Sequence, residues 1–82
     1  MSGSDELLER ITTNPEIYGG KPILRGHRMA VEHVLQLLGA GSTVDELLHY
    51  YPWMEPDDIR ACLVYAARIV GGQRVKVAAS GE

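Results

Sequence analysis

The feature that most constrains the fold is a series of three helix-forming segments between residues 31 and 70, separated by glycine and proline. Residues 31–38, VEHVLQLL, place their apolar side chains on one helical stripe, and the glycines of GAGST end that helix. Thr43 and Glu46 have the spacing of a capping box, which predicts a second helix over 44–51. A third helix is predicted over 57–70, so the pattern favours a helix-turn-helix bundle.

Short β-strands are predicted on both sides of these helices. RITTNP, at residues 10–15, is β-prone and ends at a turn signal, and a short extended run surrounds Ile23 and Leu24. RVKVA, at residues 74–78, alternates charged and apolar side chains. The predicted fold class is therefore mainly α, a three-helix bundle with short N- and C-terminal β-strands.

The length and the chain ends predict the domain organisation. A flexible or short helical N-terminus is expected over 1–9, a single domain with an N-terminal β-hairpin over 10–72, and a strand or tail over 73–82. Because a domain of 82 residues buries only a modest core, a homodimer or a bound partner is expected. The start of the chain does not resemble a signal peptide, and no apolar run is long enough to span a membrane, so we expect a cytoplasmic protein without membrane contact.

Positive charge is concentrated in one short stretch, IYGGKPILRGHRM, at residues 17–29. The formal net charge of the chain is −3, which removes the strong expectation of nucleic-acid binding that a basic domain would give. The charge is distributed along the chain as −3 over residues 1–20, +3 over 21–30, −5 over 31–60 and +2 over 61–82. Any basic surface is therefore local.

Spacing excludes two specific functions for this stretch. A phosphate loop of the Walker type requires Ser or Thr after Gly-Lys, whereas Pro22 follows Lys21. A metal site requires clustered ligands, and the sequence separation of His27, His33 and His49 does not produce a ligand pair on one helix. No metal site is predicted.

The cations of the stretch allow two explanations. Its glycines and Pro22 are explained by turns and by the start of a strand. Lys21, Arg25 and Arg28 either form a solvated surface paired with the protein's own carboxylates, or contact DNA phosphates. In the second case, Arg74 and Lys76 on the C-terminal strand are expected to join them.

The third helix is apolar around most of its circumference. One broad face, predicted to be buried, comprises Ile59, Cys62, Leu63, Ala66, Ile69 and Val70. The apolar surface continues on the other side, so a partner interface is predicted at Ala61, Val64, Tyr65, Ala67 and Arg68. The alternative is that the alanines are exposed singly as good helix formers. Because acidic side chains surround the start of this helix, it is poorly suited to reading the major groove of DNA.

No set of residues assembles an active site. Cys62 has no neighbouring base and is explained as a small buried apolar residue. Asp57 and Asp58 are explained by the dipole at the start of the third helix, and Trp53 by packing of the connector. We therefore predict no catalytic residues and no cofactor, and expect that the protein is not an enzyme.

The segment RITTNPEIYGGKPILRGHRMAVEHVLQLLGAGSTVDELLHYYPWMEPDDIRACLVYAA, residues 10–67, resembles the bacterial domain-of-unknown-function family 433. The resemblance rests on the blocks GGKP, LRG, VEHVL and DIRACLVYAA. It implies a homeodomain-like helix-turn-helix fold with an N-terminal β-element. One departure is His27, where the family usually has Thr.

The resemblance also implies a biological role, because some members of that family resemble VapB-type antitoxins encoded beside PIN-domain ribonucleases. The leading hypothesis is an antitoxin-like, DNA-binding regulatory module of a type II toxin–antitoxin system, with a PIN-domain toxin and its own promoter DNA as possible partners. The alternative is a protein-interaction adaptor domain without nucleic-acid binding. The acidic net charge favours the adaptor, and the cationic stretch favours DNA.

Overall fold

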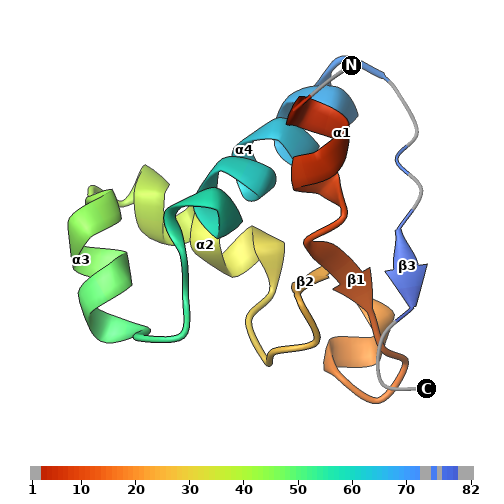
Figure 1. The fold of residues 1–82 in the computed structure, drawn as a ribbon, viewed down its shortest axis with the longest axis horizontal. Coiled ribbons are helices and arrows are strands. Elements are labelled where there is room, and N and C mark those ends of the chain that lie inside the picture. The colour runs from red at the N-terminus through yellow and green to blue at the C-terminus, as the bar shows by residue number, and fades with distance from the viewer. Residues whose placement is uncertain (1–2, 73–74, 76, 80–82) are drawn as a thin grey trace.

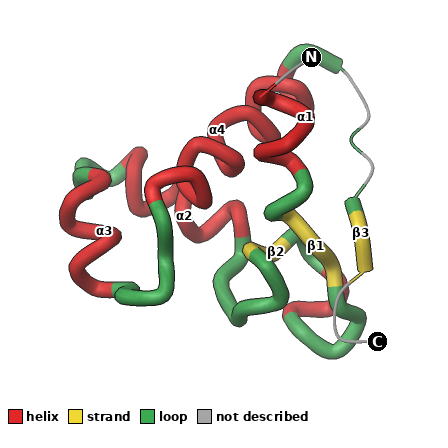
Figure 2. The backbone as a smooth tube through the Cα atoms, in the orientation of Figure 1, coloured by secondary structure: helices red, strands yellow, loops and turns green. Residues whose placement is uncertain are grey.

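A computed structural model of the chain describes residues 3–72, 75 and 77–79. Helices predominate, and a small three-stranded sheet lies at one side of the helices (Figure 1, Figure 2). The elements in chain order are α1 (Gly3–Leu8), β1 (Ile11–Thr13), the 3₁₀ turn η1 (Tyr18–Gly20), β2 (Ile23–Leu24), α2 (Val31–Gly39), α3 (Val44–Tyr50), α4 (Pro56–Val70) and β3 (Ala78–Ala79). The prediction of a mainly α fold with a few short strands is confirmed.

The three predicted helices correspond to α2, α3 and α4, and each observed end lies within one residue of its prediction. The capping box at the start of α3 is formed: the Glu46 amide donates to Thr43 Oγ1 at 3.1 Å, and the Thr43 amide donates to Glu46 Oε1 at 2.8 Å. Pro56 occupies the first turn of α4, where it sacrifices no helical hydrogen bond. These ends were predictable because each is set by residues within one turn.

The sheet has the strand order β2-β1-β3 and forms within the single chain. β1 and β2 are antiparallel, with Ile11 opposite Leu24, whereas β1 and β3 are parallel, with Thr12 opposite Ala78. The C-terminal strand β3 begins at Ala78, the last residue of the segment 74–78 over which a strand was predicted.

The core lies between α4 and the elements that surround it. Its fully buried side chains include Ile11 and Leu24 from the sheet, Val34 from α2 and Ile59 from α4. Leu7 of α1 joins the same cluster, and Figure 1 shows α1 beside the C-terminal end of α4. None of the helices in the described ranges is both long enough and apolar enough to cross a membrane.

Candidate functional site

A tight turn between β2 and α2 determines how the cationic stretch is presented. Arg25 and Gly26 form the centre of the turn, and both have left-handed backbones, with φ values of 46° and 76°. The His27 amide donates to the Leu24 carbonyl at 2.7 Å, and the Gly26 amide donates to Thr12 Oγ1 at 3.0 Å. Two positive φ values in succession are typical of turns that connect antiparallel segments, and here they direct Arg25 and Arg28 to different surroundings.

The Arg25 side chain binds a carboxylate of α4. Its Nε donates to Asp58 Oδ1 at 2.9 Å and its Nη2 donates to Asp58 Oδ2 at 2.7 Å, which is a bidentate pair. Nη2 also donates to the Trp53 carbonyl at 3.0 Å. The guanidinium of Arg25 therefore ties the β2–α2 turn to the start of α4.

Asp58 is completely buried and receives a second arginine. Arg10 Nη1 donates to Asp58 Oδ1 at 3.0 Å and to Glu55 Oε1 at 2.7 Å, and the Glu55 amide donates to Asp58 Oδ2 at 2.8 Å. Burial on its own would raise the pKa of Asp58, but the hydrogen bonds from Arg25, the Glu55 amide and Arg10 outweigh it and hold the pKa below its usual value. Asp58 is therefore a buried carboxylate that stays ionised.

An aromatic pair lies beside the ion cluster, which consists of Arg10, Arg25, Glu55 and Asp58. The His27 and Trp53 rings stack in parallel, with their centroids 3.8 Å apart and their planes at 6°. The Arg25 guanidinium carbon lies 5.7 Å from the centroid of the Trp53 ring. Trp53 thus packs against other parts of the chain, as predicted.

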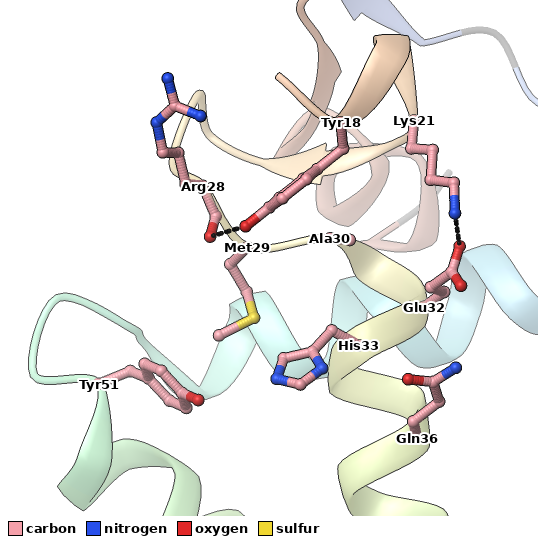
Figure 3. Close-up of a pocket in the computed structure, with 9 residues that line it drawn as sticks. All are labelled: Tyr18, Lys21, Arg28, Met29, Ala30, Glu32, His33, Gln36 and Tyr51. Atoms are coloured by element: carbon pink, nitrogen blue, oxygen red, sulfur yellow. Dashed lines mark hydrogen bonds and ion pairs between the residues drawn. The ribbon is translucent and has the colours of Figure 1, made fainter.

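A second group of polar side chains lines an open groove of about 370 Å³ beside the N-terminal half of α2, which we call the polar groove (Figure 3). It is lined by Tyr18, Lys21, Arg28, Met29, Ala30, Glu32, His33, Gln36 and Tyr51. Tyr18 Oη donates to the Arg28 carbonyl at 3.1 Å, and Lys21 Nζ lies 3.0 Å from Glu32 Oε1. His33 and Gln36 project from α2, with Tyr51 across from His33 (Figure 3). Glu32 is the only acidic residue in this lining.

The three predicted phosphate-contacting cations of the stretch differ in their ion pairing, although Lys21 and Arg28 both line the polar groove. Arg25 is engaged by Asp58, and Lys21 by Glu32 in a pair whose two side chains are each 56% exposed. Arg28 is exposed, and its guanidinium has no ion-pair partner among the residues that the structure describes. Two of the three cations are thus paired with the protein's own carboxylates, which is the first of the two explanations given above.

The remaining predicted phosphate contacts, Arg74 and Lys76, lie outside the described residues. Sequence reasoning did not identify Tyr18, His33 and Gln36 as neighbours of Arg28 in the polar groove. No spacing rule connects them, because they come from η1, the turn and α2, and only the folded chain brings these segments together.

A third surface, the apolar groove, lies between α2 and the C-terminal end of α4 and has a volume of about 270 Å³. It is lined by Pro22, Val31, Glu32, Leu35, Tyr65, Ala66, Ile69 and Val70. Cys62 is completely buried on α4, but Ile69, two turns further along the same face, is 47% exposed, and Val70 is 87% exposed. The apolar face of α4 therefore continues beyond the part that the domain itself covers.

The prediction of which α4 side chains are buried and which form a partner interface requires correction. Ala61, predicted to be part of a partner interface, is completely buried and belongs to the core cluster that includes Leu7 of α1. Leu63, Ile69 and Val70, predicted to be buried, are instead at least 47% exposed. A short helical N-terminus was predicted over 1–9, and α1 (Gly3–Leu8) agrees with it, but its packing against one side of α4 was not predicted.

The other predicted interface residues remain partly accessible. Val64 and Tyr65 are half-buried and pack against the core, whereas Ala67 is exposed. Arg68 Nη2 forms an ion pair with Asp5 Oδ1 of α1 at 3.1 Å. Tyr65 alone among the five predicted interface residues lines the apolar groove.

The described part of the chain contains no group of His, Cys, Asp and Glu side chains that could hold a metal ion. Cys62 is buried, and burial raises the pKa of its thiol to about 12, so it is a poor nucleophile near neutral pH. The polar groove and the apolar groove are therefore the candidate functional surfaces, and both are suited to binding.

Comparison with known proteins gives a family match and a similar solved structure over most of the chain. Residues 11–66 match the family described as Protein of unknown function (DUF433), so the chain belongs to that family. It is similar to a crystal structure of a DUF433 member protein from Anabaena variabilis, with 25% sequence identity and a TM-score of 0.72. That similarity covers 83% of this chain and 67% of the other.

A curated relative is much longer than this chain. The chain is 36% identical over 73 residues to Uncharacterized protein y4eO of Sinorhizobium fredii. The similarity covers 80% of this chain but only 33% of that relative, so the chain spans about a third of the relative's length.

Proposed function

We propose that this domain is an antitoxin-like, DNA-binding regulatory module of a type II toxin–antitoxin system, and that it contacts DNA phosphates through the polar groove. The observation that carries the proposal is the lining of that groove. Arg28 offers an exposed guanidinium without an ion-pair partner in the described part of the chain, and His33 and Gln36 lie in the same groove. Hydrogen-bond donors of this kind bind phosphate oxygens.

The charges around the groove support this choice of surface. Glu32, the only acidic residue in the lining, already lies 3.0 Å from Lys21, which reduces its repulsion of a phosphate. The buried Asp58 is likewise neutralised by two arginines. The domain can therefore present a local cationic surface in spite of its net charge of −3.

The alternative surface for DNA, the exposed side of α4, is less suitable. A helix that reads base edges displays polar side chains along one face. Leu63 and Ala67 are exposed on α4, and Arg60 is held by Asp57 at 3.1 Å. In this proposal a homeodomain-like arrangement of α2, α3 and α4 serves mainly as a scaffold for the turn and the polar groove.

Two partners in this proposal follow from the family resemblance: a PIN-domain toxin and DNA from the chain's own promoter. A third, a second copy of the chain, follows from the small size of the domain. The proposal places all of them in the cytoplasm. The family membership supports the presence of the shared domain, and the role in a toxin–antitoxin system is our proposal.

A salt titration of DNA binding tests the proposal. Each phosphate contact contributes about 0.9 to the slope of log K against log salt concentration. A dimer in which Arg28 is replaced by Ala in both chains is expected to lose nearly two units of slope on DNA from upstream of its own gene. Arg25 is unsuitable for this test, because its loss would also disturb Asp58.

Arg60→Ala is the matched control, since it removes the same charge from an exposed arginine that does not line the polar groove. It should leave the slope unchanged. If Arg28→Ala and Arg60→Ala have the same slope as the wild type, the polar groove does not contact phosphates. If the wild type binds no DNA at low salt, either alone or with a co-expressed neighbouring protein, the DNA proposal is wrong.

The alternative proposal is a protein-interaction adaptor without nucleic-acid binding. The net charge of −3 and the apolar groove favour it. It takes first place if the wild type fails to bind DNA in the titration above.

A further inference from the structure

We infer that the apolar groove is an interface between two copies of this chain, related by a two-fold axis, in which the C-terminal end of α4 from each copy packs into the groove of the other. The inference goes beyond DNA binding and does not depend on it. It replaces the interface predicted from the sequence, which included the buried Ala61, with the surface between α2 and α4.

The first argument is that this groove continues the core. Cys62 is completely buried, yet Ile69 on the same face of α4 is 47% exposed. Where the apolar stripe of a helix continues beyond its buried part, apolar side chains are exposed to water. A protein partner that packs on them removes this apolar area from water. The half-buried Tyr65 also lines the groove and supplies an aromatic anchor of a type enriched at interfaces.

The second argument concerns charge. Glu32 is the only charged residue that lines the groove, and Lys21 already neutralises it at 3.0 Å. Two chains that each carry a net charge of −3 repel one another, so a contact surface without unpaired charge is favourable because it adds nothing to that repulsion. The groove satisfies this condition, and it offers no unpaired charge that would select an acidic or a basic partner.

The third argument is self-complementarity. A two-fold interface needs both a protrusion and a recess on the same patch, because each copy contributes both. Val70, which is 87% exposed, protrudes beside a recess lined by Leu35 and Ala66. A standard interface buries about 800 Å² on each copy, which is about 15% of the 5209 Å² surface of this chain.

The test is sedimentation equilibrium of the wild type and of Val70→Lys, at chain concentrations from about 1 to about 500 µM. We expect the wild type to reach twice the monomer mass of 9.0 kDa as concentration rises. We expect Val70→Lys to weaken dimerisation about 100-fold, a factor of ten for each copy of residue 70. The added lysine lowers the net negative charge, so a loss of dimer cannot be attributed to greater repulsion between the chains.

Val44→Lys is the matched control. Val44 is 41% exposed at the start of α3. Figure 1 shows α3 on the opposite side of the molecule from the C-terminal end of α4. Val44→Lys makes the same chemical change outside the groove and should leave dimerisation unaltered. Val70→Ser, which removes apolar area without adding charge, should weaken dimerisation by about tenfold.

Two results would overturn the inference. One is a wild type that remains a monomer up to the highest concentration. That result would overturn the inference even if the groove bound a different protein. The other is a dimer that Val70→Lys leaves as strong as the wild type, since the two chains must then meet elsewhere. All three variants change exposed side chains, and unchanged circular dichroism would show that they are folded.

Discussion

Asp58 is the residue whose replacement tests the ion cluster most directly. It is completely buried, and its two oxygens accept hydrogen bonds from Arg25, Arg10 and the Glu55 amide at 2.7–3.0 Å. Asp58→Asn keeps the size and one acceptor oxygen but removes the negative charge. We expect this variant to lower the free energy of unfolding because two guanidinium groups then lose their shared counter-ion.

The magnitude follows from the exposure of the two arginines. Removing one partner of a fully buried ion pair costs about 3–5 kcal/mol. The side chains of Arg10 and Arg25 are 27% and 33% exposed, so water can partly replace the lost carboxylate. We therefore expect a cost of about 3 kcal/mol, the lower end of that range. A domain of this size has a total stability of about 4–12 kcal/mol, so the change is large.

The pH dependence has a definite sign. The pKa of Asp58 is lower in the folded chain than its usual value, so its ionised form stabilises the fold above the unfolded-state pKa. The difference between wild type and Asp58→Asn is expected to be complete at neutral pH. It should shrink as the pH falls below about 4, towards the folded-state pKa, because the wild-type carboxylate becomes protonated.

Urea unfolding followed by the fluorescence of Trp53 provides the assay, since Trp53 is the only tryptophan and stacks on His27. Asp57→Asn is the matched control: the Asp57 side chain is 46% exposed, and its change should cost about 1 kcal/mol or less. Equal costs for the two variants would refute the argument from burial. A difference that does not shrink on acidification would refute the assigned ionisation of Asp58.

Two remaining predictions concern α3 and the buried thiol. Thr43→Ala removes the cap of α3 and should cost about 1 kcal/mol, whereas Leu47→Ala empties core volume and should cost about 2–4 kcal/mol. Urea midpoints that rank the cap above the core would contradict the position of α3. Cys62 should not react with a thiol reagent in the native protein and should react once urea unfolds it, because burial raises the pKa of its thiol to about 12. Rapid reaction of the native protein would contradict its burial.

The helix boundaries could be predicted because they depend on chemistry within a few residues. Thr43 and Glu46 form both hydrogen bonds of the capping box, and Pro56 lies in the first turn of α4. These interactions need no information from the rest of the fold. The strands near Ile11 and Ile23 were predictable for the same reason, since a turn signal and an apolar run lie next to each other in the sequence.

The sides of α4 could not be predicted with the same success. Periodicity identifies an apolar stripe along a helix, but it does not show how much of that stripe other elements bury. Ala61 is buried in a cluster with Leu7, because α1 covers a side of α4 that a three-helix prediction leaves open. Ile69 is 47% exposed, although Cys62, two turns earlier on the same face, is completely buried.

The role of Arg25 depends on contacts between distant parts of the sequence. Asp58 lies 33 residues away, and sequence spacing alone relates neither residue to the other. A count of charges along the chain placed Arg25 with Lys21 and Arg28 in one cationic group. In the folded chain Lys21 and Arg28 line the polar groove, whereas Arg25 is paired with Asp58. The candidate surface was therefore only partly visible in the sequence.

The β2–α2 turn connects the ion cluster with the polar groove, because it carries both Arg25 of the cluster and Arg28 of the groove. Asp58 holds Arg25, and only two residues, Gly26 and His27, separate Arg25 from Arg28 at the groove. Since Arg25 also bonds the Trp53 carbonyl, the start of the turn is fixed from two directions. The buried pair thus uses one cation of the stretch to fix the position from which another, Arg28, faces solvent. From the sequence alone, Asp58 is explained by the helix dipole at the start of α4. In the folded chain, Asp58 also orients the surface that we propose for DNA.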